Sequence, residues 1–508
     1  IYNIIKNKIL KFICSLYYGS DKGTCPAVAK SEEFLVKSGV ELAAMIRNRK
    51  ITSYELVNAY CERSKKLAGQ INSIMEGPFS EALDEAKQLD EKIANNQISD
   101  AEFNRKPFLG VPFSVKETIA VKGKLYTLGV ISRKDIRSDQ DASCVEMMKK
   151  AGCIIIATTT IPEVSLWAES INNISGYANN PYDKRKTPGG SSGGQGALIS
   201  ACGVPFGLGT DVGGSVRIPG FYCGIFSHKP TIELINRRGC CLETGNEITM
   251  NTVGPMTRYA TDLKPMMKVL VEPKNLEILK LDEQVNVKSL RYFYVSNNGD
   301  KNTTPMSSEL KGAMKKVVKH FEELTGKSVQ EVKLTGMEKA LNIWGYMMKK
   351  EQNEAVMEAL TGGKKINPYI ELVKWIFGKS VFTLASIQNM TGTGLMVNDS
   401  AEKMEDLMKK CESEFKGLLG DDGILLYPSA TQEAPFHNTL LLQIRNIYTM
   451  LFNVLKCPAT QVPLGLNKEG LPLGIQVVAT QNRDRHTIAV AEELEKAFNG
   501  WVPPFVIE

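Results

Sequence analysis

Apolar positions near the start of the chain recur at helical spacing. Leu42, Met45 and Ile46 fall on one face of a helix, and the run Thr52–Glu55 has the residue types of a capping box at the start of a second helix. The pattern predicts that two helices precede the first strand of the fold.

Further along, short apolar runs alternate with helical patterns. We expect strands over Phe108–Val115, Cys153–Ala157, Pro205–Gly209 and Leu471–Ala479, with a helix over Asp141–Gly152. This alternation predicts an α/β fold with a twisted, mixed and largely parallel central sheet covered by helices on both faces. Neither an internal repeat nor a low-complexity linker interrupts the sequence, so we expect a single large domain over residues 31–508.

Residues 310–410 are mostly helical in pattern and rich in Met and Lys, which predicts a helical elaboration laid over the sheet. Within this stretch, Pro368 begins a segment whose apolar residues cover more of a helix than one amphipathic stripe: Tyr369, Leu372, Val373, Trp375, Ile376 and Phe377. These side chains could face an acyl chain or a membrane surface. We favour core packing, because most aromatic helix faces are buried.

The first 30 residues form a separate, basic and apolar segment. Residues 1–18 mix many apolar side chains with Lys6, Lys8 and Lys11, so no apolar run reaches the length of about 18 residues that a membrane span needs. An interfacial helix at a membrane, a helix packed on the domain and a remnant of a signal peptide are all compatible with this pattern.

Composition sets broad limits on the class of protein. With 43% hydrophobic and 23% charged residues the chain is typical of a globular protein, and a net charge of +6 over 508 residues is too small to indicate a nucleic-acid partner. The 11 scattered cysteines lack CxxC spacing and predict reduced thiols in an intracellular, cytosol-facing protein. No clustered His and Cys ligand set is present, so we expect neither metal nor cofactor.

Two glycine-rich loops, residues 187–196 and 207–219, carry the candidate chemistry. They lack the Gly-Lys-Ser/Thr ending of a phosphate-binding loop and the G-x-G-x-x-G pattern of a dinucleotide site, which argues against nucleotide binding. Each loop instead presents serine in a backbone-shaped site, Ser191 and Ser192 in the first and Ser215 in the second.

Ser215 is a candidate nucleophile, because the amides of Val212, Gly213, Gly214 and Ser215 could converge on the oxygen that becomes negative when a hydroxyl attacks a carbonyl. A serine needs a base, and none of the 4 histidines lies in a motif typical of a Ser-His-Asp triad. Lys116 ends an apolar strand, where burial would favour the neutral amine, and is therefore the candidate base.

These segments resemble the amidase signature family. The resemblance lies in Gly189–Gly194, Asp211–Pro219 and Gly110–Glu117, within a signature core of about residues 105–235, and continues through Cys153–Glu163 to Gly470–Gln476. It implies Ser215 as nucleophile, Ser191 as proton shuttle and neutral Lys116 as base, with a cis peptide between Gly190 and Ser191. It also implies that Ser192, Asp211 and Arg217 brace the two loops.

Within the family, the chain looks most like the fatty acid amide hydrolases of type 2. The similar stretches are Asn179–Asp183, Gly224–Pro230, Leu426–Ser429 and Cys457–Gln461. This resemblance implies a small-molecule lipid amide as substrate: primary fatty amides, N-acyl ethanolamines or, by extension, N-acyl amino acids. The basic, apolar N-terminal segment and the aromatic segment Tyr369–Phe382 fit such a substrate if the protein makes peripheral contact with a membrane or lipid droplet, but both also fit plain packing. A homodimer is left open. The alternatives are a small-amide amidase, a non-catalytic lipid-amide carrier and a glutamine amidotransferase subunit.

Overall fold

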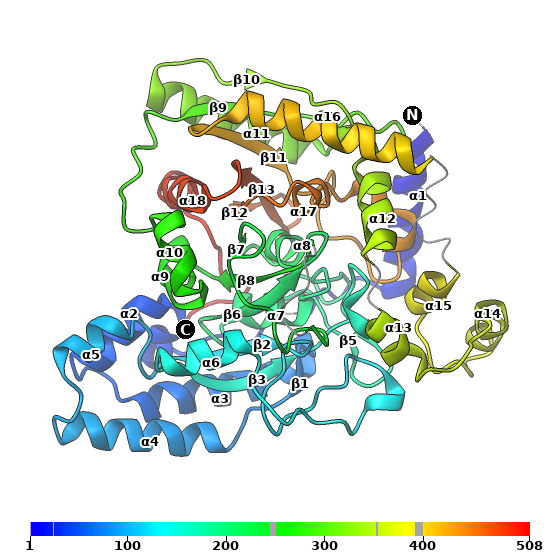
Figure 1. Cartoon of the computed structure of the whole chain (residues 1–508). Helices are drawn as coiled ribbons and strands as arrows, with labels where there is room; N and C mark the ends of the chain where they lie inside the picture. The colour runs from blue at the N-terminus through cyan, green and yellow to red at the C-terminus, as the bar shows by residue number, and fades with distance from the viewer. Residues whose placement is uncertain (1, 24, 244–249, 352–353, 392–399) are drawn as a thin grey trace.

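A single long sheet organises the molecule. The computed structural model describes residues 2–23, 25–243, 250–351, 354–391 and 400–508. Its main sheet has 11 strands in the order β1-β3-β2-β6-β8-β7-β12-β13-β11-β9-β10 (Figure 1). The strands are β1 (Ile74–Glu76), β2 (Pro112–Lys116), β3 (Ile154–Thr159), β6 (Phe206–Asp211), β7 (Phe226–Lys229), β8 (Thr252–Thr257), β9 (Arg291–Tyr294), β10 (Gln330–Glu331), β11 (Gly423–Pro428), β12 (Ala459–Leu466) and β13 (Pro472–Val478), and β4 (Ile171–Asn172) pairs separately with β5 (Gly176–Tyr177).

The sheet is mixed, as the sequence predicts. Strands β3, β2 and β6 pair in parallel, as do β11, β9 and β10. The strands between these two groups, from β6 through β8, β7, β12 and β13 to β11, pair antiparallel. Parallel pairing is therefore less extensive than the alternation of strands and helices predicts, because β7 and β8 pair directly with each other and so do β12 and β13.

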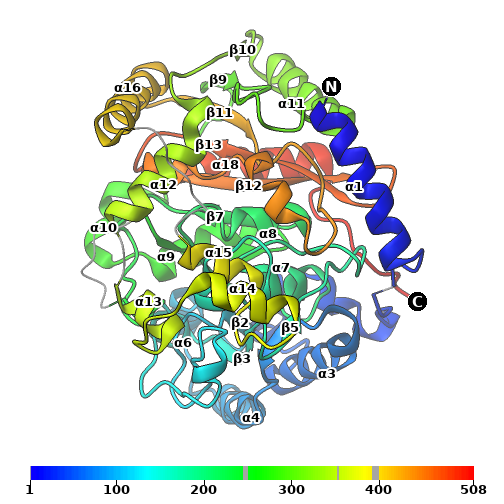
Figure 2. The same ribbon diagram turned by 90° about the vertical axis from the view of Figure 1, so that its right-hand side faces the viewer.

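Helices cover both faces of the sheet. One face carries α6 (Ser143–Lys150), α9 (Leu263–Leu270) and α18 (Asp484–Phe498), and the other carries α3 (Ser53–Ile71), α7 (Gly193–Ser200) and α8 (Arg217–Tyr222) (Figures 1 and 2). The largest cluster of buried apolar side chains extends from Cys25 to Trp501. The remaining helices of the first part of the chain are α2 (Gly39–Arg47), α4 (Glu81–Ala94), α5 (Asp100–Arg105) and α10 (Pro273–Leu279), with the 3-10 turns η1 (Lys30–Val36), η2 (Ile131–Arg133), η3 (Glu163–Ser165) and η4 (Ala260–Asp262).

The predicted elements that surround the glycine-rich loops are confirmed. Strands β2, β3, β6 and β13 fall within the predicted segments to within two residues, except that β2 begins only at Pro112, after a turn at Gly110. Helix α6 lies where a helix was expected. Helices α2 and α3 precede the first strand, and Thr52 and Glu55 form the predicted capping box of α3.

The stretch predicted as a helical elaboration is mostly helical in its described residues, with the short strand β10 and loops between its helices, whereas 352–353 and 392–399 lie outside the described residues. It contains α11 (Ser308–Thr325), α12 (Ala340–Lys350), α13 (Glu354–Thr361), α14 (Pro368–Ile376), α15 (Leu384–Met390) and α16 (Ala401–Leu419), with η5 (Met337–Lys339); η6 (Leu440–Leu442), η7 (Ile444–Asn446) and α17 (Leu451–Val454) follow.

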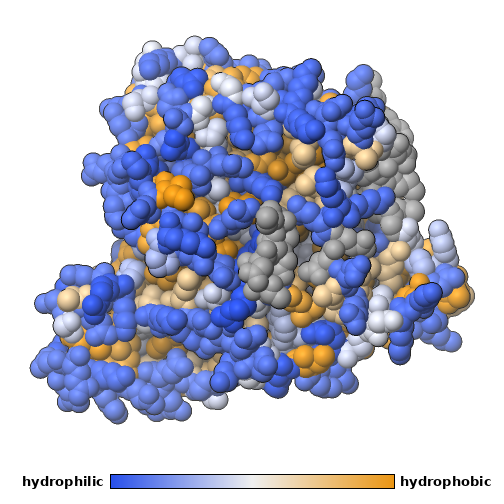
Figure 3. Space-filling model, in the orientation of Figure 1, coloured by the Kyte–Doolittle hydropathy of each residue, from blue (hydrophilic) through white to orange (hydrophobic). Residues whose placement is uncertain are grey.

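Helix α14 turns its apolar side chains outward, so our prediction of core packing for this segment is wrong. Tyr369, Ile370, Val373, Ile376 and Phe377 are exposed, and hydrophobic atoms mark this helix at the right-hand edge of Figure 3. The side that faces inward instead buries a charged residue. Glu371 accepts hydrogen bonds from Ser380 Oγ (2.8 Å) and Lys374 Nζ (2.6 Å). The helix packs mainly on α15, and its apolar residues stay open to solvent.

The N-terminal helix α1 (Tyr2–Tyr18) also leaves an apolar face open. Ile5, Ile9, Phe12, Ile13 and Leu16 are exposed. The opposite side contacts the loop of residues 430–446: Asn7 Nδ2 donates to Gln432 Oε1 (3.1 Å), and the ring of Tyr18 stacks on that of Phe436. The helix therefore packs on the domain through one side and keeps the open apolar face that an interfacial helix needs.

Figure 2 views the face of the molecule on which α1 and α14 lie. Among the helices that the structure describes, none combines the length and the apolar character needed to cross a membrane.

Candidate active site

Lys116 is the last residue of β2, and its side chain is fully buried. Strand β2 lies between the parallel strands β3 and β6, so its carboxyl end opens toward the loop that follows β6. The amine Nζ lies 2.7 Å from Ser191 Oγ and 2.7 Å from Thr210 Oγ1. The structure thus brings the predicted base into hydrogen-bond contact with the first of the two serine loops.

Burial changes the acidity of this amine. Loss of hydration lowers the pKa of Lys116 to about 8, and the nearby Cys241, Asp211 and Cys240 oppose that shift only in part. The neutral amine keeps two N–H groups and gains a lone pair. In that state it can donate to Thr210 Oγ1 and accept the proton of the Ser191 hydroxyl.

Ser191 lies in the loop that leads into α7, and the peptide bond between Gly190 and Ser191 is cis, as the family resemblance implies. The loop is braced by Ser170, whose Oγ accepts from the amide of Gly193 (2.8 Å) and donates toward the Gly189 carbonyl (3.1 Å). A Cβ atom at Gly190 would lie 2.8 Å from backbone atoms of residues 167 and 168, so this close approach requires glycine.

Ser215 lies on the turn between β6 and α8 and is 8% exposed. The amide of Ser192 donates to the carbonyl of Ser215 (3.1 Å), which joins the two serine loops directly. Ser192 therefore braces the loops through its backbone. Its hydroxyl points to the carbonyl of Thr210 at 3.5 Å.

A buried ion pair holds the second loop. Asp211 and Arg217 are both fully buried, and Arg217 Nη2 lies 3.0 Å from Asp211 Oδ1. Burial alone would raise the pKa of Asp211, but the adjacent guanidinium and a hydrogen bond from Asn453 hold it well below its usual range. Arg217 also donates to the Thr449 carbonyl (2.8 Å) and to Gln476 Oε1 (2.9 Å). Both predicted bracing residues thus tie the serine loop to the C-terminal half of the chain.

The four amides predicted to face a negative oxygen do not all do so. Gly214 N–H donates to Asp211 Oδ1 (2.8 Å), because the buried carboxylate needs donors on both oxygens, and Val216 N–H supplies the other oxygen (3.1 Å). The prediction is therefore wrong for Gly214. The amides of Val212, Gly213 and Ser215 remain candidate donors to the negative oxygen.

Two residues that sequence reasoning missed fix the outer side of this turn. Trp344 Nε1 donates to the Val212 carbonyl (2.7 Å), and its ring lies so close to Gly213 that a Cβ there would be 2.9 Å away. Thr449 Oγ1 donates to the Gly213 carbonyl (2.6 Å). Both come from elements distant in the sequence, and neither stands in a motif. Thr210, also missed, could have been found as the hydroxyl residue directly before Asp211, the last residue of β6.

Comparison with known proteins shows similarity in both sequence and fold. The family model described as Amidase matches residues 55–488. The chain belongs to the amidase family. This amidase-signature hydrolase is 40% identical over 490 residues to fatty-acid amide hydrolase 2 of Homo sapiens. The match covers 93% of this chain and 91% of the relative.

Two further proteins are less similar in sequence. One glutamyl-tRNA(Gln) amidotransferase subunit, from Caldanaerobacter subterraneus, is 25% identical over 484 residues, covering 90% of this amidase and 96% of that protein. The solved structure of a fatty acid amide hydrolase superposes with a TM-score of 0.72 at 20% identity, covering 98% of this chain and 89% of that one. Within the described residues, no group of three His, Cys, Asp or Glu side chains is arranged to hold a metal ion.

We expect Arg217→Gln to lower the free energy of unfolding by about 3–5 kcal/mol, because it removes the guanidinium paired with the buried Asp211 carboxylate. Urea denaturation followed by fluorescence measures the change. The matched control is Arg47→Gln, which removes an exposed pair with Asp100 and should cost less than about 1 kcal/mol. Equal effects of the two substitutions would contradict the role given to the buried pair.

Proposed function

We propose that this amidase hydrolyses fatty acid amides and related N-acyl amines through an acyl-enzyme formed on Ser215. The substrates are primary fatty amides, N-acyl ethanolamines and N-acyl amino acids. The observation that carries the proposal is the buried contact of 2.7 Å between Lys116 Nζ and Ser191 Oγ, in a loop that is hydrogen-bonded to the backbone of Ser215.

In the proposed reaction, neutral Lys116 accepts the proton of Ser191, which takes the proton of Ser215 as Ser215 Oγ attacks the carbonyl carbon. The amides of Val212, Gly213 and Ser215 stabilise the oxyanion of the tetrahedral intermediate. The C–N bond then breaks, and Ser191 passes a proton to the departing nitrogen. Water then attacks the acyl ester on Ser215 and gives its proton through Ser191 to Lys116. The proton returns by the same residues to the Ser215 oxygen as the carboxylic acid leaves.

The choice of a lipid amide rests on the surface near the serine loops and on the relatives. Thr383, the first residue before α15, donates through Oγ1 to Glu163 Oε2 (2.8 Å). Residues 163–169 then run to the backbone contact with Gly190, next to Ser191. The exposed apolar helix α14 packs on α15. These contacts link the exposed helix α14, through α15, to the segment that touches the Ser191 loop, and we propose that a membrane-dissolved substrate approaches the site from this side. A polar substrate such as glutamine would need no exposed apolar helix.

We expect Ser215→Ala to abolish hydrolysis of oleamide and Lys116→Met to slow it by at least about 10³-fold, since methionine keeps the buried volume but cannot accept a proton. The rate of Ser191→Ala should be close to that of Lys116→Met, because both residues lie on one proton path. Release of ammonia from oleamide by the isolated chain measures all three.

Glutamine serves as the second substrate in the same assay. Hydrolysis of oleamide but not of glutamine by the wild-type chain supports the lipid-amide assignment. Preference for glutamine would instead favour the amidotransferase alternative. Full activity of either Ser215→Ala or Lys116→Met would refute the mechanism whatever the substrate.

The same proposal includes peripheral membrane contact through α14 and α1. We expect Ile376→Asp to lower partition of the protein onto phosphatidylcholine vesicles by about tenfold or more, because one buried isoleucine contributes about 1.5–3 kcal/mol. Ile278→Asp, on α10 at the opposite side of the molecule, changes another exposed isoleucine and should leave partition unchanged.

Vesicle flotation measures the bound fraction of each variant. Equal losses in both variants would contradict a contact through α14. A dimer that dissociates on Ile376→Asp, with no vesicle binding by the wild-type chain, would assign the α14 face to a second copy of the chain instead.

A further inference from the structure

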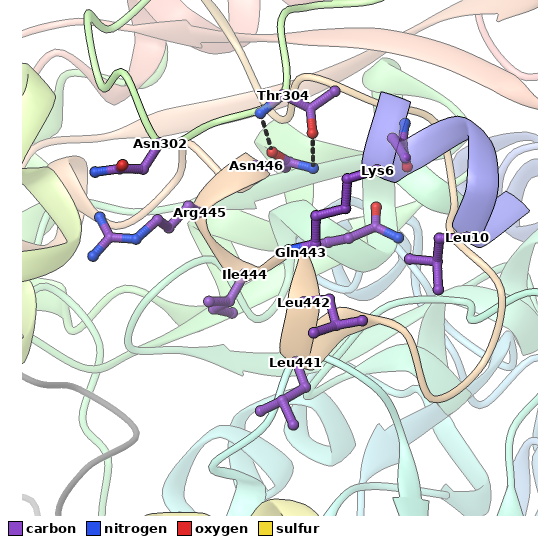
Figure 4. A pocket seen from close by; sticks show the side chains of 11 residues that line it. Lys6, Leu10, Asn302, Thr304, Leu441, Leu442, Gln443, Ile444, Arg445 and Asn446 are labelled. Carbon is purple, nitrogen blue, oxygen red and sulfur yellow. Dashed lines mark hydrogen bonds between the residues drawn. The ribbon is translucent and has the colours of Figure 1, made fainter. Parts of the chain in front are cut away.

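A pocket of about 480 Å³ lies between α1 and the turns that follow residue 440. Figure 4 shows its two kinds of wall: Leu441, Leu442 and Ile444 form an apolar side, while Thr304 and Asn446 form a polar side. Hydrogen bonds between Thr304 and Asn446 (2.9 and 3.4 Å) hold the polar side in place. The volume is that of a small-ligand site, and none of the lining residues belongs to the proposed catalytic set.

Helix α1 contributes Lys6, Asn7 and Leu10 to this pocket. At 3.6 residues per turn, the exposed residues Ile5, Ile9, Phe12 and Leu16 share one face of the helix, and Asn7, Leu10, Cys14 and Tyr18 share the opposite, packed face. Lys6 falls at one border between these faces, and Lys8 and Lys11 fall at the other. Lysines that flank an open apolar face are typical of a helix lying in a membrane interface.

The exposed apolar surface continues on the far side of Lys6. Leu441 and Leu442 are both exposed. The pocket therefore lies between these leucines and the open face of α1, and Lys6 lines it. Figure 4 shows the Lys6 side chain extending from α1 toward Gln443.

The other cation of the pocket, Arg445, points away from Lys6 and is paired with Asp300 (3.0 Å). Helix α1 carries no acidic residue. No acidic residue is among the described residues that line the pocket, so Lys6 contributes a positive charge that no lining carboxylate neutralises.

We infer that this pocket binds the headgroup of an anionic phospholipid presented by a bilayer. In this arrangement Lys6 contacts the phosphate, the polar side chains of Asn7 and Gln443 line the pocket beside it, and the acyl chains lie along Leu10 and Leu442 and over the open face of α1. The inference rests on the proposed membrane contact. It adds a selectivity for anionic lipid that an apolar surface alone does not provide.

The test compares Lys6→Gln with Lys8→Gln in vesicle flotation. Both variants lose one charge from the same helix, but Lys8 lies outside the pocket. With vesicles of phosphatidylcholine plus phosphatidylserine, Lys8→Gln should weaken binding by about fivefold, the effect of one lysine near an anionic surface. Lys6→Gln should weaken it by about tenfold or more, because the direct phosphate contact is lost as well.

Equal losses in the two variants would overturn the pocket in favour of general attraction to the surface. Displacement of the protein from the vesicles by inorganic phosphate, added at the same concentration as the lipid, would overturn the headgroup pocket in favour of a site for free phosphate. Vesicle binding that stays unchanged in the presence of phosphate supports the headgroup.

The controls separate this inference from the function on which it rests. On pure phosphatidylcholine, and in hydrolysis of a water-soluble amide, Lys6→Gln should match the wild-type chain. Failure of the wild-type chain to bind phosphatidylcholine would defeat the membrane contact itself. Binding to both lipids without preference would defeat only the headgroup pocket.

Discussion

A lysine amine shut away from water is the constraint on which the site depends. At the end of β2, the amine of Lys116 is buried and not hydrated, and its hydrogen-bond partners are the hydroxyls of Ser191 and Thr210. Burial therefore lowers its pKa toward the range in which a neutral amine is present at working pH. The parallel group β3-β2-β6 supplies this position, since it places the strand end against the loop after β6.

The two serine loops are held more firmly than their glycine content suggests. Asp211 and Arg217 neutralise each other inside the fold, and Arg217 reaches the carbonyl of Thr449. Trp344 also holds the turn, because its Nε1 donates to the Val212 carbonyl. Because these contacts fix the turn, the amides of Val212, Gly213 and Ser215 would need little reorganisation if they stabilise the oxyanion as proposed, and electrostatic stabilisation is most effective under that condition.

Local motifs allowed Lys116, Ser191 and Ser215 to be chosen as candidates from the sequence, because each stands in a continuous glycine-rich or apolar segment. Contacts across long sequence separations could not be predicted in this way: Arg217 and Thr449 are 232 residues apart. Nor does hydropathy alone tell which side of a helix meets solvent. Helix α14 has enough apolar residues for a core helix, yet it buries Glu371 and exposes Ile376 and Phe377.

The central claim is that a neutral Lys116 activates Ser215 through Ser191. The most direct test is the rate at which a fluorophosphonate labels Ser215, measured by mass spectrometry across pH in the wild-type chain and in Lys116→Met. The account predicts that the wild-type rate rises through about pH 8, as the amine loses its proton, and that the variant is labelled slowly at every pH. Equal, pH-independent labelling of the two proteins, or no labelling at Ser215, would contradict it.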